Sequence, residues 1–146
     1  MTDSPPQGYV LDELKVGMSA ELVREVTEEK IALFAEASDD YNPLHMDEDF
    51  ARTTPYRGRI AHGLLSASYV SAVVGTMLPG PGAIFLGQTM TFHKPVRIGD
   101  VVTARVTVAS VDPEKARVVL SCACLVNGEP VLDGEAQVRV PRRRKR

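Results

Sequence analysis

Several features that point to common protein classes are scarce or missing in this 146-residue sequence. Aromatic residues make up only 5%, and no stripe of basic residues with interleaved aromatics occurs, which argues against nucleic-acid binding as the main activity. No apolar run is long enough to span a bilayer. The polar, proline-containing segment 1–7 does not have the pattern of a secretory signal. We therefore expect a cytoplasmic protein with neither nucleic acid nor membrane as a partner.

The sequence also has few of the groups that hold metals or form covalent intermediates. Its two cysteines, Cys122 and Cys124, alternate with alanine in a strand-like run and have no further ligands at metal-binding spacing. We interpret them as small buried strand residues without a redox role, and we expect no metal site. No G-x-S-x-G motif occurs, so the serines of the apolar segment 63–78 lack the turn that a nucleophilic serine needs.

Length and composition are those of one ordinary globular domain. Hydrophobic residues make up 44% and charged residues 25%, and no internal repeat or interior linker divides the chain. The last five residues are all basic, and subtracting their charge from the net −2 leaves −7 on the rest. We divide the chain into a lead (1–15), a domain (16–140) and a basic tail (141–146). Residues 1–8 and the tail are expected to be loose, solvated ends.

Hydrophobic periodicity predicts an α+β domain in which one long helix packs against an antiparallel sheet. The alternation over residues 19–26 predicts a first strand. The segment 63–78 is apolar all round, which predicts a buried helix. Four runs rich in β-branched residues predict the remaining strands, over 84–92, 101–111, 116–126 and 131–140. The Asn127-Gly128 pair between the last two runs is a strong hairpin signal.

Shorter helices are expected before residue 63. Thr27 can cap a helix that runs to about residue 38, and Asp47 can cap a shorter one through Ala51. Between them, Pro43 disfavours helical geometry at the preceding residue. We therefore expect a tight loop, not a helix, over residues 40–45.

That loop is the most informative part of the sequence. It reads Asp39-Asp40-Tyr41-Asn42-Pro43-Leu44-His45, and His62-Gly63-Leu64-Leu65 follows further along. A carboxylate and an imidazole thus lie on either side of a proline, ahead of a glycine at the start of an apolar helix. A carboxylate and an imidazole can share one water, and a helix N-terminus can hold a developing oxyanion. These groups suit the addition or removal of water next to a thioester carbonyl.

The same segments resemble the signature of the MaoC-like (R)-specific enoyl-CoA hydratases, which are hot-dog fold dehydratases. Residues 34–45 carry the D-x-N-P-x-H element, residues 60–65 carry the H-G pair, and residues 85–100 carry the later G-Q and P-V-x-x-G-D pieces. The resemblance covers residues 16–140. It implies a single hot-dog fold, an antiparallel sheet wrapped around a long central helix. It also implies a hydro-lyase that reversibly adds water to a trans-2-enoyl thioester.

The resemblance implies a role for each matching residue. Asp40 and His45 are the expected catalytic pair, with the Gly63 N–H as the oxyanion donor. Asn42, His62 and Ser71 are expected in the substrate-binding part of the site, with Ser71 lining the acyl pocket. No cofactor is implied, because coenzyme A is part of the substrate. The partner is an acyl-CoA or an acyl carrier protein thioester, and the fold implies a homodimer.

Several alternatives stay open at this stage. Gly63 can be a glycine only for close packing, and Asn42 can serve the turn instead of the site. The His62 side chain is expected to pack or to cap the helix start, and either member of the Asp40–His45 pair can be the base. Two other functions compete with hydration: a thioesterase on the same fold, and an acyl-CoA-binding module without catalysis.

Overall fold

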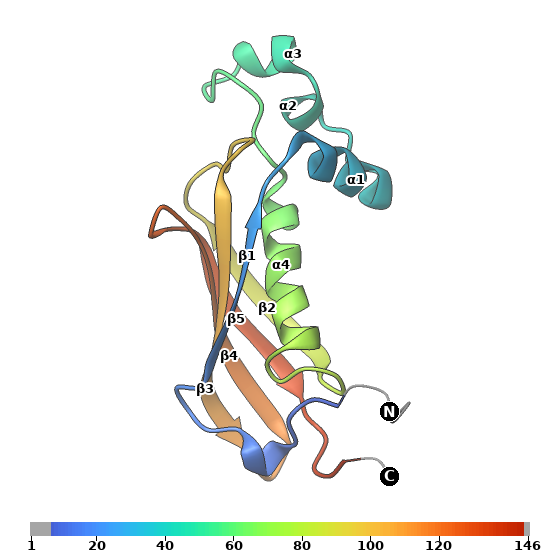
Figure 1. Ribbon diagram of the computed structural model, residues 1–146, viewed down its shortest axis with the longest axis vertical. Helices are drawn as coiled ribbons and strands as arrows, with labels where there is room; N and C mark the ends of the chain where they lie inside the picture. The colour runs from blue at the N-terminus through green and yellow to red at the C-terminus, as the bar shows by residue number, and fades with distance from the viewer. Residues whose placement is uncertain (1–6, 145–146) are drawn as a thin grey trace, which may run out of the picture.

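The computed structural model describes residues 7–144. Five antiparallel strands form one sheet in the spatial order β1-β3-β4-β5-β2, and the long helix α4 lies along one face of it (Figure 1). The strands are β1 (Ser19–Glu25), β2 (Ile84–Phe92), β3 (Val101–Asp112), β4 (Arg117–Val126) and β5 (Glu129–Arg139). The helices are η1 (Leu11–Glu13), α1 (Glu28–Ser38), α2 (Pro43–Met46), α3 (Glu48–Arg52) and α4 (Gly63–Thr76). The predicted α+β hot-dog fold is confirmed.

The sheet forms because side chains along its strands alternate between a buried and an exposed face. In most of β3 and β4 every second residue is buried, as the two-residue period of a strand requires. The β4–β5 hairpin turns at Asn127 and Gly128, whose φ values of 52° and 78° suit a type I′ turn. The predicted strands and hairpin are confirmed. Cys122 and Cys124 are buried and free, as the strand pattern predicts.

Helix α4 packs on β1, β3 and β4 through one apolar side. The buried residues of that side include Leu65, Val70, Val73 and Val74. The opposite side is open within one chain, where Leu64 is 56% exposed and Ser71 and Gly75 are also exposed. The prediction that this helix is buried all round is therefore wrong for a single chain, because the sheet covers only the side that faces it.

Three short helices, α1 to α3, gather at the end of the molecule where α4 begins (Figure 1). Thr27 caps α1 by accepting the Lys30 N–H, and Asp47 caps α3 by accepting the Phe50 N–H. Both caps agree with the sequence prediction. Within residues 7–144, no helix combines the length and the apolar character needed to cross a membrane.

Residues 43–46 form the short helix α2, where the sequence predicted a loop. The proline occupies the first position of this helix, where a backbone N–H is not needed. Its restriction falls on the preceding residue, Asn42, which is non-helical and serves as the N-cap. The loop prediction was right for residues 40–42 and wrong for the turn that carries His45.

Both ends of the described chain are held against the domain. Leu11 and Leu14 are buried in the main core, and the Leu11 N–H donates to the Pro141 carbonyl at 2.9 Å. The Gly8 N–H donates to the turn that follows α4, and Arg142 donates to two carbonyls of the β3–β4 turn. The prediction of loose ends is therefore wrong for residues 8 and 141–142. The expectations for residues 1–6 and 145–146 lie outside the described residues.

Candidate active site

A cavity of about 410 Å³ opens where α2, the beginning of α4 and the end of β2 meet. Its lining includes Asp40, His45, His62, Gly63, Ser66 and Phe92. Apolar side chains with a few convergent polar groups are the usual character of a small-molecule site. The cavity thus brings together the predicted catalytic pair, the predicted oxyanion donor and one predicted substrate-binding residue.

Asp40 reaches the cavity because α1 ends immediately before it. Asp39 adopts a left-handed conformation with φ 63°, which terminates the helix. The Asp40 N–H donates to the Ser38 hydroxyl at 3.1 Å, and its Oδ1 accepts the Asn42 N–H at 3.2 Å. Of the two adjacent aspartates, Asp40 lines the cavity.

Asn42 has a local role that supports the site from outside. Its Oδ1 accepts the Leu44 N–H at 3.0 Å and so caps α2. It does not line the cavity, so the structure favours the turn alternative over direct contact with substrate. Because α2 carries His45, this cap orients the histidine indirectly.

His45 is buried, and two hydrogen bonds fix its position. Its Nδ1 lies 2.8 Å from the Ile60 carbonyl, and its own carbonyl accepts the Arg59 Nε–H at 2.7 Å. A carbonyl can only accept, so Nδ1 carries the proton and the neutral ring keeps a lone pair on Nε2. Burial, opposed by the hydrogen bond to Ile60, holds the His45 pKa below its ordinary value of 6.5. His45 is therefore neutral near pH 7.

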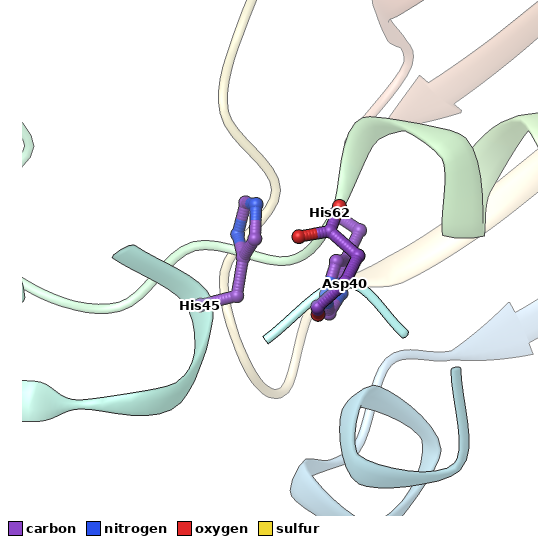
Figure 2. Close-up of side chains that lie close together, drawn as sticks. All are labelled: Asp40, His45 and His62. Carbon is purple, nitrogen blue, oxygen red and sulfur yellow. The ribbon is translucent and has the colours of Figure 1, made fainter. Parts of the chain in front are cut away.

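Figure 2 shows the Asp40 carboxylate and the His45 ring turned toward each other, with the His62 ring beside them. A carboxylate oxygen and one nitrogen of each ring lie within 4.8 Å of one another. That spacing suits a water held between Asp40 and His45. It suits a metal ion poorly, because the two rings stack with centroids 4.1 Å apart and planes 33° from parallel. Two histidines that share an ion must instead direct in-plane lone pairs at one point.

Gly63 begins α4, so its N–H has no acceptor within the helix. The partial positive charge of this helix end therefore faces the cavity that Gly63 lines. A Cβ at this position would lie only 2.5 Å from Cε1 of Phe92, so the position of the Phe92 ring also favours glycine. The packing explanation of Gly63 thus holds and explains why no side chain covers the N–H, and the oxyanion role stays a prediction.

His62 is packed, which is one of the two arrangements expected from the sequence, whereas Ser71 is placed differently from expectation. His62 makes no side-chain cap on α4, and its Nε2 lies 2.9 Å from the Asp40 carbonyl. Ser71 does not line the cavity and lies on the open side of α4. Ser66 lines the cavity instead, and its buried hydroxyl has no hydrogen-bond partner among the described residues. The spacing of four residues from His62 to Ser66, about one helical turn, is the sequence signal for this residue.

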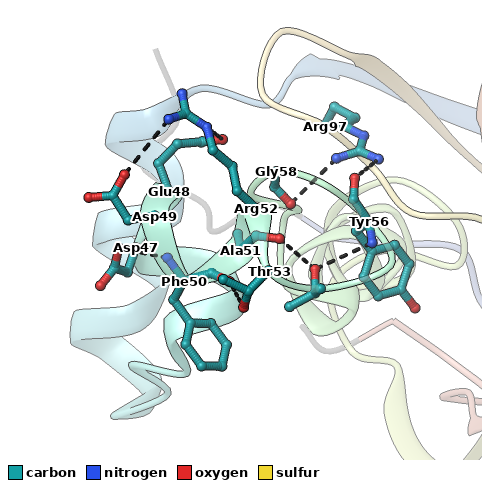
Figure 3. Close-up of polar contacts among 11 residues, drawn as sticks. Asp47, Glu48, Asp49, Phe50, Ala51, Arg52, Thr53, Tyr56, Gly58 and Arg97 are labelled. Carbon is teal, nitrogen blue, oxygen red and sulfur yellow. Dashed lines mark hydrogen bonds and ion pairs between the residues drawn. The ribbon is translucent and has the colours of Figure 1, made fainter.

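The segment between α3 and α4 forms one wall of the cavity through Tyr56 and Ile60. Arg97 holds this wall by donating to the Tyr56 carbonyl at 2.7 Å and to the Gly58 carbonyl at 3.4 Å (Figure 3). Sequence reasoning missed these residues, because the segment follows no helical or strand period. Asp100 lies three residues after Arg97 and accepts its backbone N–H at 2.8 Å, which keeps this turn in place.

Comparison with known proteins identifies the family. A family model described as the MaoC like domain matches residues 12–122. The chain belongs to the MaoC-like dehydratase family. This confirms the resemblance seen in the sequence, and the match includes the segments that carry Asp40, His45 and Gly63.

Members of the MaoC-like family with assigned activities are similar over nearly the whole chain. An (R)-specific enoyl-CoA hydratase of Rhodospirillum rubrum is 51% identical over 135 residues, 92% of this chain and 94% of that protein. A 3-hydroxybutyryl-CoA dehydratase of Methylorubrum extorquens is 49% identical over 132 residues, 90% of this chain and 84% of that protein. The unliganded R-hydratase of Pseudomonas aeruginosa superposes with a TM-score of 0.87 at 41% identity, covering 94% of this chain and 88% of that one.

Proposed function

We propose that the protein is an (R)-specific enoyl-CoA hydratase, a hydro-lyase that reversibly adds water to a trans-2-enoyl thioester. The observation that carries this proposal is the facing pair of Asp40 and His45 beside the N-terminus of α4. The hydratases and the dehydratase to which the chain is similar act on enoyl-CoA or 3-hydroxybutyryl-CoA, as their names state. Coenzyme A enters as part of the substrate, so no separate cofactor is proposed.

The pair is suited to hold one water. The Asp40 carboxylate oxygen and the Nε2 lone pair of neutral His45 are both acceptors, so a single water can donate one hydrogen to each. The water is then oriented by two hydrogen bonds, and its oxygen lone pairs are left to attack carbon. This arrangement requires neutral His45, which burial of the ring favours.

Hydration then proceeds with balanced bonds and protons. The water oxygen bonds to C3 while one water proton passes to the pair, and the π electrons move to make an enolate on the thioester. The Gly63 N–H stabilises the enolate oxygen, a contribution typically worth about 3 kcal/mol. The proton held by the pair then passes to C2, which restores the starting state. We assign the proton transfer to His45, because the Ile60 carbonyl holds its Nδ1–H and leaves Nε2 free to take the proton.

The test measures the loss of ultraviolet absorbance of crotonyl-CoA, whose conjugated double bond disappears on hydration. Asp40→Asn and His45→Gln should each lower kcat by at least about 100-fold. Asp39→Asn is the matched control, because asparagine also tolerates the left-handed conformation of this neighbour; its rate should stay near native. Near-native rates in the Asp40 or His45 variants of a folded protein would refute the assignment.

Two further readouts separate hydration from its rivals. Hydration gives a product that a dehydrogenase specific for (R)-3-hydroxyacyl-CoA accepts, whereas a thioesterase releases a thiol that a thiol-reactive dye detects. An acyl-CoA-binding module without catalysis would give neither signal and would still bind crotonyl-CoA. Replacing coenzyme A by an acyl carrier protein in the same assay determines which carrier is preferred.

The open edge of the sheet supports a homodimer. Strand β2 pairs only with β5 among the described residues, and eight of its nine residues are exposed. Ile84, Phe85, Leu86 and Phe92 are large apolar side chains on this edge strand. A long apolar edge is a template for pairing with another strand. A second copy that pairs at β2 would cover this edge.

Light scattering tests the dimer directly, and we expect twice the mass of one chain. Leu86→Lys places a charge on the exposed edge strand and should shift the protein toward monomer. Lys30→Leu, on α1 away from this edge, is the control and should leave the mass unchanged. A monomeric native protein would contradict the dimer. The cytoplasmic location expected from the sequence stays a prediction.

A further inference from the structure

The His62 ring contacts both members of the catalytic pair. Its Nε2 lies 2.9 Å from the Asp40 carbonyl, and its ring centroid lies 4.1 Å from that of His45. Phe34, on α1, packs against the same ring at a centroid distance of 4.8 Å. The His62 side chain is 2% exposed, so these neighbours leave it little freedom.

Among the described residues, the hydrogen bond to His62 is the long-range hydrogen bond of Asp40. The other hydrogen bonds of Asp40 among the described residues go to Ser38 and Asn42, each only two positions away. Such local bonds shape the turn but do not attach it to the rest of the domain. The bond to His62 spans 22 positions and ties the turn to the start of α4.

The proton arrangement of His62 follows from this bond. A backbone carbonyl accepts but cannot donate, so Nε2 of His62 carries the proton. The other ring nitrogen, Nδ1, is buried and has no hydrogen-bond partner among the described residues. His62 is therefore a donor toward the Asp40 backbone and a flat surface toward His45.

We propose that His62 is a positioning residue that sets the separation of Asp40 and His45 through one hydrogen bond and one ring stack. This inference rests on the proposed function, because the separation matters for the water held between the pair. His62 does not contact the reacting atoms in this arrangement. From the sequence we expected His62 in the substrate-binding part of the site, with a side chain that packs or caps α4. The side chain packs and makes no cap, and holding the catalytic pair is a role that the sequence did not indicate.

Two substitutions separate the hydrogen bond from the stack. His62→Phe keeps a flat ring and removes the donor, whereas His62→Gln keeps an N–H donor near the Nε2 position and removes the ring. We expect His62→Phe to lower kcat about tenfold with little change in KM, as the loss of one hydrogen bond predicts. His62→Gln should retain more activity than His62→Phe. A native kcat in His62→Phe would overturn the proposal.

A double-substitution cycle distinguishes positioning from a general effect on the fold. If His62 acts through Asp40, His62→Phe should reduce the residual rate of Asp40→Asn by less than about threefold. Fully multiplicative losses would contradict the proposal. Tyr69→Phe is the control, since it removes from α4 a buried hydroxyl that has no hydrogen-bond partner within residues 7–144. Its kcat should match the native value.

A spectroscopic measurement tests the arrangement without substrate. Imidazole ¹⁵N–¹H correlation spectra at mildly alkaline pH should show His62 protonated at Nε2 and His45 protonated at Nδ1. The chain has three histidines, and the ring missing from the His62→Phe spectrum identifies His62. A His62 ring protonated at Nδ1 overturns the proposal even if no hydratase activity is found. Absence of activity with the expected tautomers counts against the proposed function alone.

Discussion

The substitution Gly63→Ala should disable the enzyme while leaving the backbone N–H in place. The added Cβ would lie 2.5 Å from Cε1, 2.9 Å from Cδ1 and 3.1 Å from Cζ of Phe92. Ordinary contact begins at 3.4 Å, so the distance between the added Cβ and Cε1 of Phe92 would be 0.9 Å too short. Either the Phe92 ring or the start of α4 must move.

The two movements have different consequences. Phe92 is 50% exposed, so its ring can turn outward in part, and the loss of stability should stay within the about 1–3 kcal/mol typical of overpacking. The rest of the clash must be relieved by movement of the start of α4, which displaces the Gly63 N–H, the proposed oxyanion donor. A misplacement of about 1 Å in a catalytic group can cost about 100-fold in rate. Because the ring takes up part of the 0.9 Å, we expect kcat to fall by at least about tenfold and at most about 100-fold in a protein that still folds.

Steady-state kinetics with crotonyl-CoA and urea denaturation together test this expectation. The double variant Gly63→Ala/Phe92→Leu relieves the clash and should recover at least about tenfold of the lost kcat. Phe92→Leu alone is the control for its own effect on the cavity. A native kcat in Gly63→Ala, or no recovery in the double variant, would refute the reasoning.

Three further predictions follow from burial and packing. The His45 pKa is lowered mainly by burial, so kcat/KM for hydration should fall on the acid side with an apparent pKa below 6.5. Because the folded state holds the His45 pKa below 6.5, neutral His45 contributes stability that is lost as the pH falls from about 6.5 through the folded-state pKa. Thermal denaturation at several pH values measures this loss. Burial raises the pKa of Cys122 to about 11 and of Cys124 to about 12, so a thiol-reactive dye should label neither until the protein is unfolded. Gly134→Ala should lower the free energy of unfolding, measured by urea denaturation, by at least about 2 kcal/mol, because its Cβ would lie 1.9 Å from a carbonyl oxygen of β2. Gly75 has open space around it, so Gly75→Ala should be no less stable than the native protein.

Local signals in the sequence predicted most of the fold. Thr27 and Asp47 cap helices, and Asn127-Gly128 forms the hairpin, because these conformations depend on a few neighbouring residues. The strand bounds followed from alternation for the same reason. The order β1-β3-β4-β5-β2 was not predicted, since periodicity alone does not say which strands are neighbours.

The candidate site was predictable in part. The motif located Asp40, His45 and Gly63, which line one cavity in the structure. Ser71 was predicted to line the pocket, but Ser66 lines it instead. The two serines lie five residues apart, about 140° around the helix, so they cannot share a face.

The burial of Leu11 and Leu14 and the wall held by Arg97 were also missed. These residues contact partners far away in the chain, and no local pattern marks such contacts.

The sequence by itself determined the chemistry available to this protein: a carboxylate, an imidazole and a free helix N-terminus within one motif-bearing stretch. Only the tertiary structure decided how those groups face one another. The tautomer of His45 depends on the Ile60 carbonyl, and the position of Asp40 depends on the His62 ring. Both contacts form when α1 and α2 pack over the start of α4. Their geometry depends on three-dimensional packing, which residue spacing along the chain does not encode.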